Sequence, residues 1–280
     1  MAILPRHRTE RLPREDLLFE QILCAVDGSR GSAEAVRETL ALAPCAARMR
    51  FIAVTALTET PGDPSRVASL AAHRARQALE AAQTMAGAHA LAAGAELANA
   101  ADVAAALIER AGDRTLLVVG SHGDSAHGAT LAGSVARSIA ARRAGPLLVA
   151  RAGARADGSV PRILVAVDDT AGAAELVRVA GTIAAGCGGY VHLVHVQGRD
   201  YGSRTRHQLA ELATELIERT GAEPVVDVAC AANVAAHVCR LAQDSESSLI
   251  VAGRRRKRLS QIGEHIVDAA PCSVLVAPTA

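Results

Sequence analysis

At 280 residues the chain is long for a single hydrophobic core and is suited to two domains of ordinary size. Its formal net charge is +1, from 30 basic and 29 acidic residues, so it lacks the basic excess typical of nucleic-acid-binding and membrane-surface proteins, and neither partner is expected. With two Tyr, two Phe and no Trp, the core must be mainly aliphatic, and no aromatic platform for stacking bases is available.

Cysteine usage and the amino-terminal sequence both indicate a cytoplasmic protein. Six cysteines are scattered without a C-x-x-C pair, and Cys24 and Cys272 lie inside apolar runs, which is typical of reduced, buried thiols. No apolar run approaches the roughly 20 residues that span a bilayer, and the first residues are charged and interrupted by proline, unlike a secretion signal. We expect residues 1–19 to form a flexible extension.

Short β-branched segments alternate with longer segments of helical period along the first half of the chain. The predicted strands are 21–27, 50–56, 95–99, 115–120 and 146–150. The predicted helices are 32–43, 66–86, 102–111 and 134–143. Ser29 or Ser32 is expected to cap the first helix, and Asp102 lies near the start of the third.

The same order of elements recurs in the second half. The predicted strands are 162–168, 190–196, 224–229, 248–253 and 273–277. The predicted helices are 172–186, 204–219, 233–243 and 263–269. Alternation of helices with almost continuously apolar strands predicts an α/β fold: two tandem, doubly wound, Rossmann-like (HUP-type) domains, each with a parallel sheet covered on both faces.

Three pairs of segments indicate that the two halves are copies of one unit. The pairs keep their order along the chain: QILCAVDGS with RILVAVDDT, TLLVVG with SLIVAG, and PLLVA with SVLVA. The junction between the copies is rich in Gly, Ala and polar residues, as linkers are. We therefore expect domains at 20–152 and 161–280, joined by a linker at 153–160.

The end of the fourth predicted strand carries the clearest chemistry. A Gly-Ser-His-Gly sequence occupies 120–123, and after nine further residues Gly133 and Ser134 open a helix. Glycines let backbone approach a bulky anion, and a helix N-terminus presents free N–H groups and the positive end of its dipole. Parallel sheets bind ligands at the carboxyl ends of their strands, where Asp27 can accept hydrogen bonds from ribose hydroxyls. This pattern predicts a phosphate or nucleotide site.

A structural explanation of the same residues stays open at this point. Gly120 and Gly123 can serve only to turn the chain, and Ser134 only to start its helix. A lone pair of glycines would favour that explanation, whereas the complete G-x2-G-x9-G-S pattern between a strand and a helix favours a ligand.

That pattern resembles the ATP-binding signature of universal stress proteins, and AVDGS at 25–29 resembles their first strand and turn. The resemblance extends from about residue 20 to the end of the chain and corresponds to the tandem two-domain form. It implies five-stranded parallel sheets of order 3-2-1-4-5 and ATP as ligand. The residues that it places in the nucleotide site are Asp27, Ala56, Val119, Gly120, Gly123, Gly133, Ser134 and Val135.

The second copy departs from the signature. It reads Gly-Arg-Arg-Arg at 253–256, so arginine replaces the second glycine, and the interval to Gly263 is shorter. The residue after Gly263 is Glu264, whose carboxylate is expected to repel a phosphate. Asp168 is retained, and Asp169 follows it. We expect no ATP in this half, whose nucleotide site is degenerate.

Other polar residues are interpreted more simply. The basic run 254–258 is expected to be a solvated loop, with binding of a small anion or of DNA as alternatives. His122 and His127 are expected to be solvated loop residues, and Asp124 could hold Mg²⁺ through water. The spacing of these side chains does not match a zinc site, so no metal ligand and no catalytic residue is expected.

Three functions are compatible with these features. The expected one is a non-enzymatic, ATP-binding stress-response or signalling module that acts through an unknown protein partner. The alternatives are a slow ATP hydrolase or adenylyl-transfer enzyme of the nucleotide α-hydrolase-like fold, and a structural scaffold without ligand. The resemblance also implies that 146–150 and 273–277 dock the two halves as an internal pseudo-dimer, and that two chains form a homodimer.

Overall fold

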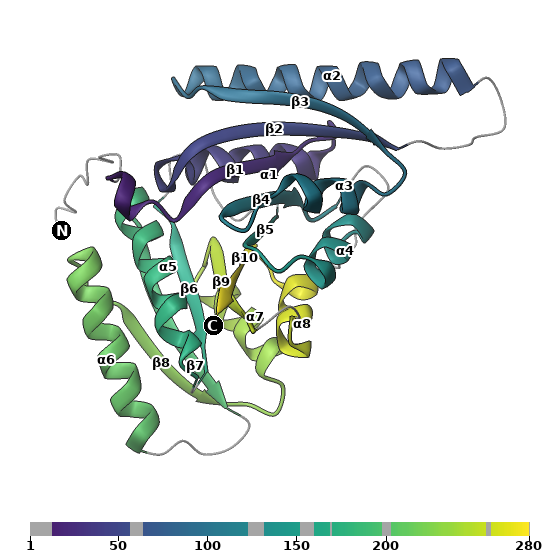
Figure 1. Ribbon diagram of the computed structural model, residues 1–280. Helices are drawn as coiled ribbons and strands as arrows, with labels where there is room; N and C mark the ends of the chain where they lie inside the picture. Colours follow the sequence, from purple (N-terminus) through teal and green to yellow (C-terminus); the bar gives the residue numbers. More distant parts are fainter. Residues whose placement is uncertain are drawn as a thin grey trace.

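The computed structural model describes residues 13–56, 64–122, 132–151, 160–168, 170–197, 203–255 and 259–279. Within them the chain forms two α/β halves that share one sheet (Figure 1). Gly123, Asp124, His127, Asp169 and residues 256–258 lie outside this part of the chain. Among the described residues, no helix combines the length and the apolar character needed to span a membrane.

The elements of the first half follow the predicted order. Its strands are β1 (Phe19–Ala25), β2 (Ala46–Ala56), β3 (Ala93–Ala100), β4 (Thr115–Gly120) and β5 (Leu147–Ala150). Its helices are α1 (Arg30–Ala41), α2 (Pro64–Ala88), α3 (Val103–Arg110) and α4 (Ser134–Arg142), with the short 3₁₀ helices η1 (Arg14–Asp16) and η2 (Ala43–Cys45). Ser29 caps α1 by accepting from the N–H of Ser32, and Asp102 caps α3 by accepting from the N–H of Ala105.

The second half repeats this arrangement. Its strands are β6 (Arg162–Val167), β7 (Tyr190–Gln197), β8 (Val225–Cys230), β9 (Leu249–Arg255) and β10 (Ser273–Thr279). Its helices are α5 (Gly172–Cys187), α6 (Ser203–Thr220), α7 (Val234–Asp244) and α8 (Gln261–Ala269). The helix predicted at 263–269 therefore begins two residues earlier, because Ser260 caps it.

Each half has the predicted strand order 3-2-1-4-5, and the two sheets are joined into one. The order across all ten strands is β3-β2-β1-β4-β5-β10-β9-β6-β7-β8. Pairing is parallel within each half, as in β1 with β2 and β6 with β7. At the centre β5 and β10 pair antiparallel, with Val149 opposite Val274. The last strands of the two copies thus dock the halves against each other, as predicted.

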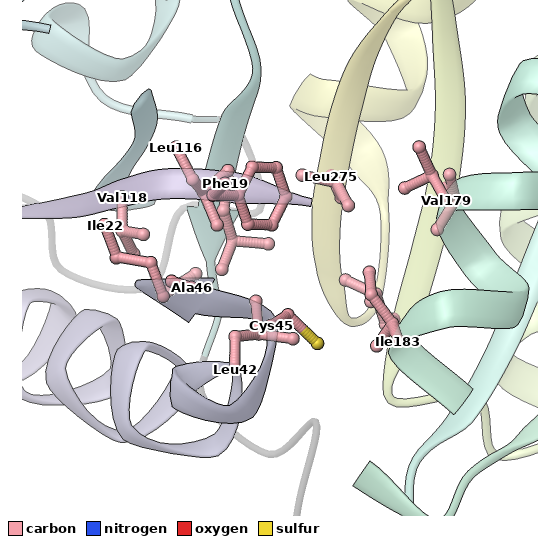
Figure 2. Close-up of a cluster of buried hydrophobic side chains, with 14 of the residues drawn as sticks. Phe19, Ile22, Leu42, Cys45, Ala46, Leu116, Val118, Val179, Ile183 and Leu275 are labelled. Carbon is pink, nitrogen blue, oxygen red and sulfur yellow. The ribbon is translucent and has the colours of Figure 1, made fainter. Parts of the chain in front are cut away.

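Helices cover both faces of the continuous sheet. One core cluster joins the strands to α1, α2, α5 and α6, and the other joins them to α3, α4, α7 and α8. At the junction of the halves, Phe19 and Cys45 face Val179 and Ile183 of α5, with Leu275 of β10 between them (Figure 2). Phe19, which the sequence analysis placed in the amino-terminal extension, is 4% exposed and belongs to β1. The halves therefore share a hydrophobic core as well as a sheet.

Candidate functional site

A cavity of about 670 Å³ opens at the carboxyl ends of β1, β2 and β4 in the first half. Its wall contains every predicted site residue of the described chain: Asp27, Ala56, Val119, Gly120, Gly133, Ser134 and Val135. The remaining wall is largely aliphatic and includes Ile52, Val54, Val103 and Leu107. Residues from four distant segments are thus gathered around one space, one side of which is apolar.

Asp27 lies in a turn that its own side chain stabilises. Its Oδ1 accepts a hydrogen bond from the N–H of Ser29 at 2.9 Å, and Gly28 supplies the positive φ of +84° that the turn needs. Ser29 then caps α1. The carboxylate of Asp27 is held at the mouth of the cavity, where it is exposed and can accept hydrogen bonds from hydroxyl groups.

Gly120 is required by the packing of α1, whether or not a ligand binds. A Cβ on Gly120 would lie 2.5 Å from the carbonyl carbon of Gly31, and a Cβ on Gly31 would lie 1.9 Å from the carbonyl oxygen of His122. The first turn of α1 therefore packs directly on the backbone at the end of β4. This close packing is a structural reason for glycine at position 120, and its partner Gly31 was not singled out from the sequence.

The N-terminus of α4 faces the cavity without a side-chain cap. Gly133 is the N-cap, and having no side chain it offers no acceptor to the first turn. The sequence predicted a free N–H at Gly133. In the structure this N–H donates to the carbonyl oxygen of Ser121 at 2.6 Å. The next three residues, Ser134, Val135 and Ala136, line the cavity. As first-turn residues, they have N–H groups without an acceptor inside the helix.

His122 was expected to be a solvated loop residue, but it lies in the wall of this cavity. Its Nδ1 is 2.9 Å from the hydroxyl oxygen of Ser121. Its Nε2 is buried and has no hydrogen-bond partner among the described residues. When the Ser121 hydroxyl donates to Nδ1, Nε2 carries the ring proton and can donate to a ligand. The imidazole adds a directed donor beside the uncapped helix.

The wall also carries a cationic side chain, Arg74, that was not predicted from the sequence. Arg74 of α2 is exposed, borders the cavity, and makes no ion pair within the described part of the chain. Helical periodicity identifies the face of α2 that carries Arg74 but not the site which that face borders. With Asp27 as the acidic residue of the described wall, Arg74 offsets its charge and gives the cavity a pole for an anionic group.

The corresponding cavity in the second half is smaller and differs at the phosphate end. Its volume is about 260 Å³, and apolar side chains such as Val194, Val234 and Ile262 contribute much of its wall. The Asp turn is preserved, since Asp168 Oδ1 accepts from the N–H of Thr170 at 3.1 Å. Ser260, however, caps α8 by accepting from the N–H of Gly263 at 3.1 Å. This helix N-terminus is therefore already occupied by its own cap.

The prediction that Glu264 stands where a phosphate would bind was wrong. Helices α4 and α8 both have nine residues, so the N-cap Ser260 corresponds to Gly133, and Glu264 is the fourth residue of its helix. Its backbone N–H donates to the carbonyl oxygen of Ser260, and its side chain is exposed. The N-terminus of α8 thus differs from that of α4 by its Ser260 cap, not by a carboxylate at the N-cap position.

The expectation of a solvated basic run was also wrong for Arg254. Arg254 and Arg255 belong to β9, and the side chain of Arg254 is fully buried, whereas that of Arg255 is exposed. Among the described residues, no cluster of three or more His, Cys, Asp or Glu side chains could hold a metal ion. The candidate site is therefore the cavity of the first half.

Comparisons with known proteins agree with this architecture. The chain is similar to a universal stress protein from Archaeoglobus fulgidus DSM 4304, with 18% identity, a TM-score of 0.75, and coverage of 92% of this chain and 98% of that one. It is also similar to a putative universal stress protein from Pseudomonas aeruginosa UCBPP-PA14, with 14% identity, a TM-score of 0.63 and coverage of 95% of each chain. These likenesses concern the fold. A comparison with curated proteins gave no match.

The sequence itself matches a family model in two places. The model, described as the universal stress protein family, matches residues 18–151 and again residues 160–278. Both halves of the repeated unit are thus covered, together with the strands that dock them. The chain belongs to the universal stress protein family.

Proposed function

We propose that the first domain, residues 20–152, binds ATP, and that the protein is a non-enzymatic stress-response or signalling module with nucleotide in this domain only. One observation carries the proposal: the uncapped N-terminus of α4 opens into a cavity whose wall contains the predicted site residues. Among the described residues, no backbone acceptor meets the N–H groups of Ser134, Val135 and Ala136, so the phosphates would accept from them.

The dimensions and the chemistry of the cavity suit an adenine nucleotide. Its volume of about 670 Å³ lies within the roughly 300–1,000 Å³ typical of ligand sites. The aliphatic wall would bury the base, and Asp27 would accept from the ribose hydroxyls. Ser134, the first turn of α4 and the Nε2 of His122 would donate to the phosphates. Mg²⁺ would be held mainly by the nucleotide's phosphates, because the described wall contains a single carboxylate, that of Asp27, which would bind the ribose.

The same geometry favours binding over turnover. Around the first turn of α4 the described wall offers the hydroxyls of Ser121 and Ser134 and the imidazole of His122, and no carboxylate. Hydrolysis needs a base that activates water in line with the phosphate. His122 is the candidate for that role, and it would support slow hydrolysis if Nε2 accepted a proton.

The second domain, residues 161–280, would hold no ATP. Its cavity of about 260 Å³ is below the usual range for ligand sites, and Ser260 already accepts from the first turn of α8. A triphosphate would have to displace this cap before it could bind to the helix.

Titration calorimetry of the full-length protein, freed of nucleotide, with ATP and with adenosine tests the proposal. We expect one ATP per chain and weaker binding of adenosine, since adenosine cannot use the N–H groups of α4. Failure of ATP to bind would refute nucleotide binding, and two ATP per chain would refute the asymmetry. Release of phosphate within minutes, lost in His122→Asn, would assign hydrolysis instead.

A further inference from the structure

Arg254 connects the second domain to the last helix of the first. It lies in β9 of the second domain, and its side chain is 0% exposed. Its Nη2 donates to the carbonyl oxygen of Ala140 in α4 at 2.6 Å. Its own carbonyl oxygen accepts from the hydroxyl of Thr279 at 3.1 Å, which fixes the strand that carries it. The guanidinium therefore crosses the boundary between the domains.

The carbonyl that Arg254 contacts belongs to the last turn of α4. This helix ends at Arg142, so the carbonyl of Ala140 has no acceptor role inside the helix, and that of Ile139 accepts from the N–H of Arg143. A cation at this end also interacts favourably with the helix dipole. Arg254 acts as a C-terminal cap of α4 that is supplied by the other domain.

The contact has a counterpart in the opposite direction. Arg151, directly after β5, donates through Nη2 to the carbonyl oxygen of Val267 and to that of Asp268 at 2.9 Å. Both carbonyls lie in the last turn of α8, which ends at Ala269. Each domain thus caps the final helix of the other with a buried arginine, in keeping with the antiparallel pairing of β5 and β10.

Stability alone does not account for a cation at this position. The Nε and Nη1 of Arg254 are buried and have no acceptor among the described residues. Burial lowers the pKa of Arg254. A second buried guanidinium, that of Arg143, lies near it, and burial is the main cause that lowers the pKa of Arg143 to about 10. Unsatisfied buried donors and neighbouring like charges both oppose folding. An apolar side chain of similar size would avoid these costs.

We propose that Arg254 is a positioning residue for the nucleotide site of the first domain, an inference that rests on the proposed function. Helix α4 has nine residues, and the end that Arg254 holds is opposite the end that faces the cavity. Fixing the last turn fixes the direction of the helix axis and hence the aim of the N–H groups of Ser134, Val135 and Ala136. The arginine that interrupts the signature in the second domain thereby serves the intact signature of the first.

The test compares Arg254→Met with Arg255→Met in the full-length protein. Both changes remove one positive charge from β9, but the side chain of Arg255 is exposed, whereas that of Arg254 is buried and bonded to α4. We expect Arg254→Met to weaken ATP binding about tenfold, which corresponds to the loss of one hydrogen bond between an N–H group of α4 and a charged phosphate. Adenosine binding should change less than about twofold. The unfolding temperature should not fall. Arg255→Met should match the wild type, and Arg254→Lys should recover most of the affinity for ATP.

The ratio of ATP affinity to adenosine affinity separates positioning from a merely structural role. If Arg254→Met leaves the ratio of ATP affinity to adenosine affinity unchanged, the inference is overturned while the proposed function stays intact. A wild-type protein that binds no ATP would refute the proposed function and the inference with it. If Arg254→Met does not fold, the same ratio of affinities is measured in Arg254→Gln, which keeps an N–H donor but loses the charge.

Discussion

Replacing Gly133 by aspartate would give α4 the cap that its counterpart α8 already has. The backbone at Gly133 has φ −66° and ψ 167°, which any L-residue adopts, and Asp is among the preferred N-cap residues. A Cβ at this position would lie 3.2 Å from the carbonyl oxygen of Ser121, so a shift of a few tenths of an ångström would accommodate it. The new carboxylate would accept from the N–H of Ala136, as Ser260 accepts from Gly263.

The size of the effect follows from two terms. One N–H donor is withdrawn from the phosphates, and a hydrogen bond to a charged group contributes about 1.5–3 kcal/mol. The carboxylate also repels a phosphate about 4 Å away, by up to about 4 kcal/mol at an effective dielectric constant of about 20. Together they exceed about 3 kcal/mol, or roughly a hundredfold loss of ATP affinity. Gly133→Ser withdraws the donor without the charge, so a loss of about tenfold is expected.

Titration calorimetry with ATP and adenosine measures this effect, and thermal unfolding without ligand checks the fold. Adenosine affinity and the unfolding temperature should stay near the wild-type values, since an Asp cap changes helix stability by only a few tenths of a kcal/mol relative to Gly. Ser260→Asp is the matched control, because it puts the same carboxylate at the N-cap of α8. Undiminished ATP affinity in Gly133→Asp would show that the phosphates bind elsewhere.

Two further predictions concern packing. Gly120→Ala should lower the free energy of unfolding by about 1–3 kcal/mol without any ligand, because its Cβ would lie 2.5 Å from the backbone of Gly31; chemical denaturation should show no such loss for Gly87→Ala, where nothing lies within 4 Å. The thiols of Cys45 and Cys187 meet between the domains, where their hydrogen bond, followed by burial, raises the pKa of Cys45. Burial and the raised pKa leave little Cys45 thiolate at neutral pH, so iodoacetamide should label the exposed Cys230 and leave Cys45 unlabelled in the native protein; mass spectrometry checks this, and rapid labelling of Cys45 would contradict its burial between the domains.

The sequence by itself determined the fold class, the order of the elements and the repeat. Apolar β-branched strands and amphipathic helices are local patterns, and they predicted the central strands clearly because buried parallel strands must be apolar throughout. The edge strands β3 and β8 are largely not buried and carry a weaker pattern. The strand order came from the family resemblance and was confirmed. The spacing of Gly120, Gly133 and Ser134, with Asp27, also located the cavity, since the carboxyl ends of neighbouring strands meet at one edge of a sheet.

Hydrogen-bond partners, by contrast, depended on contacts between residues far apart in the chain. The sequence could not show that the N–H of Gly133 donates to Ser121, or that Ser260 starts α8 early enough to move Glu264 out of the site. Nor could a run of five basic residues reveal that Arg254 turns inward to Ala140, because that carbonyl becomes a neighbour only when β5 and β10 pair. Local pattern fixes which segments form strands and helices, whereas the satisfaction of buried polar groups is decided by the whole fold.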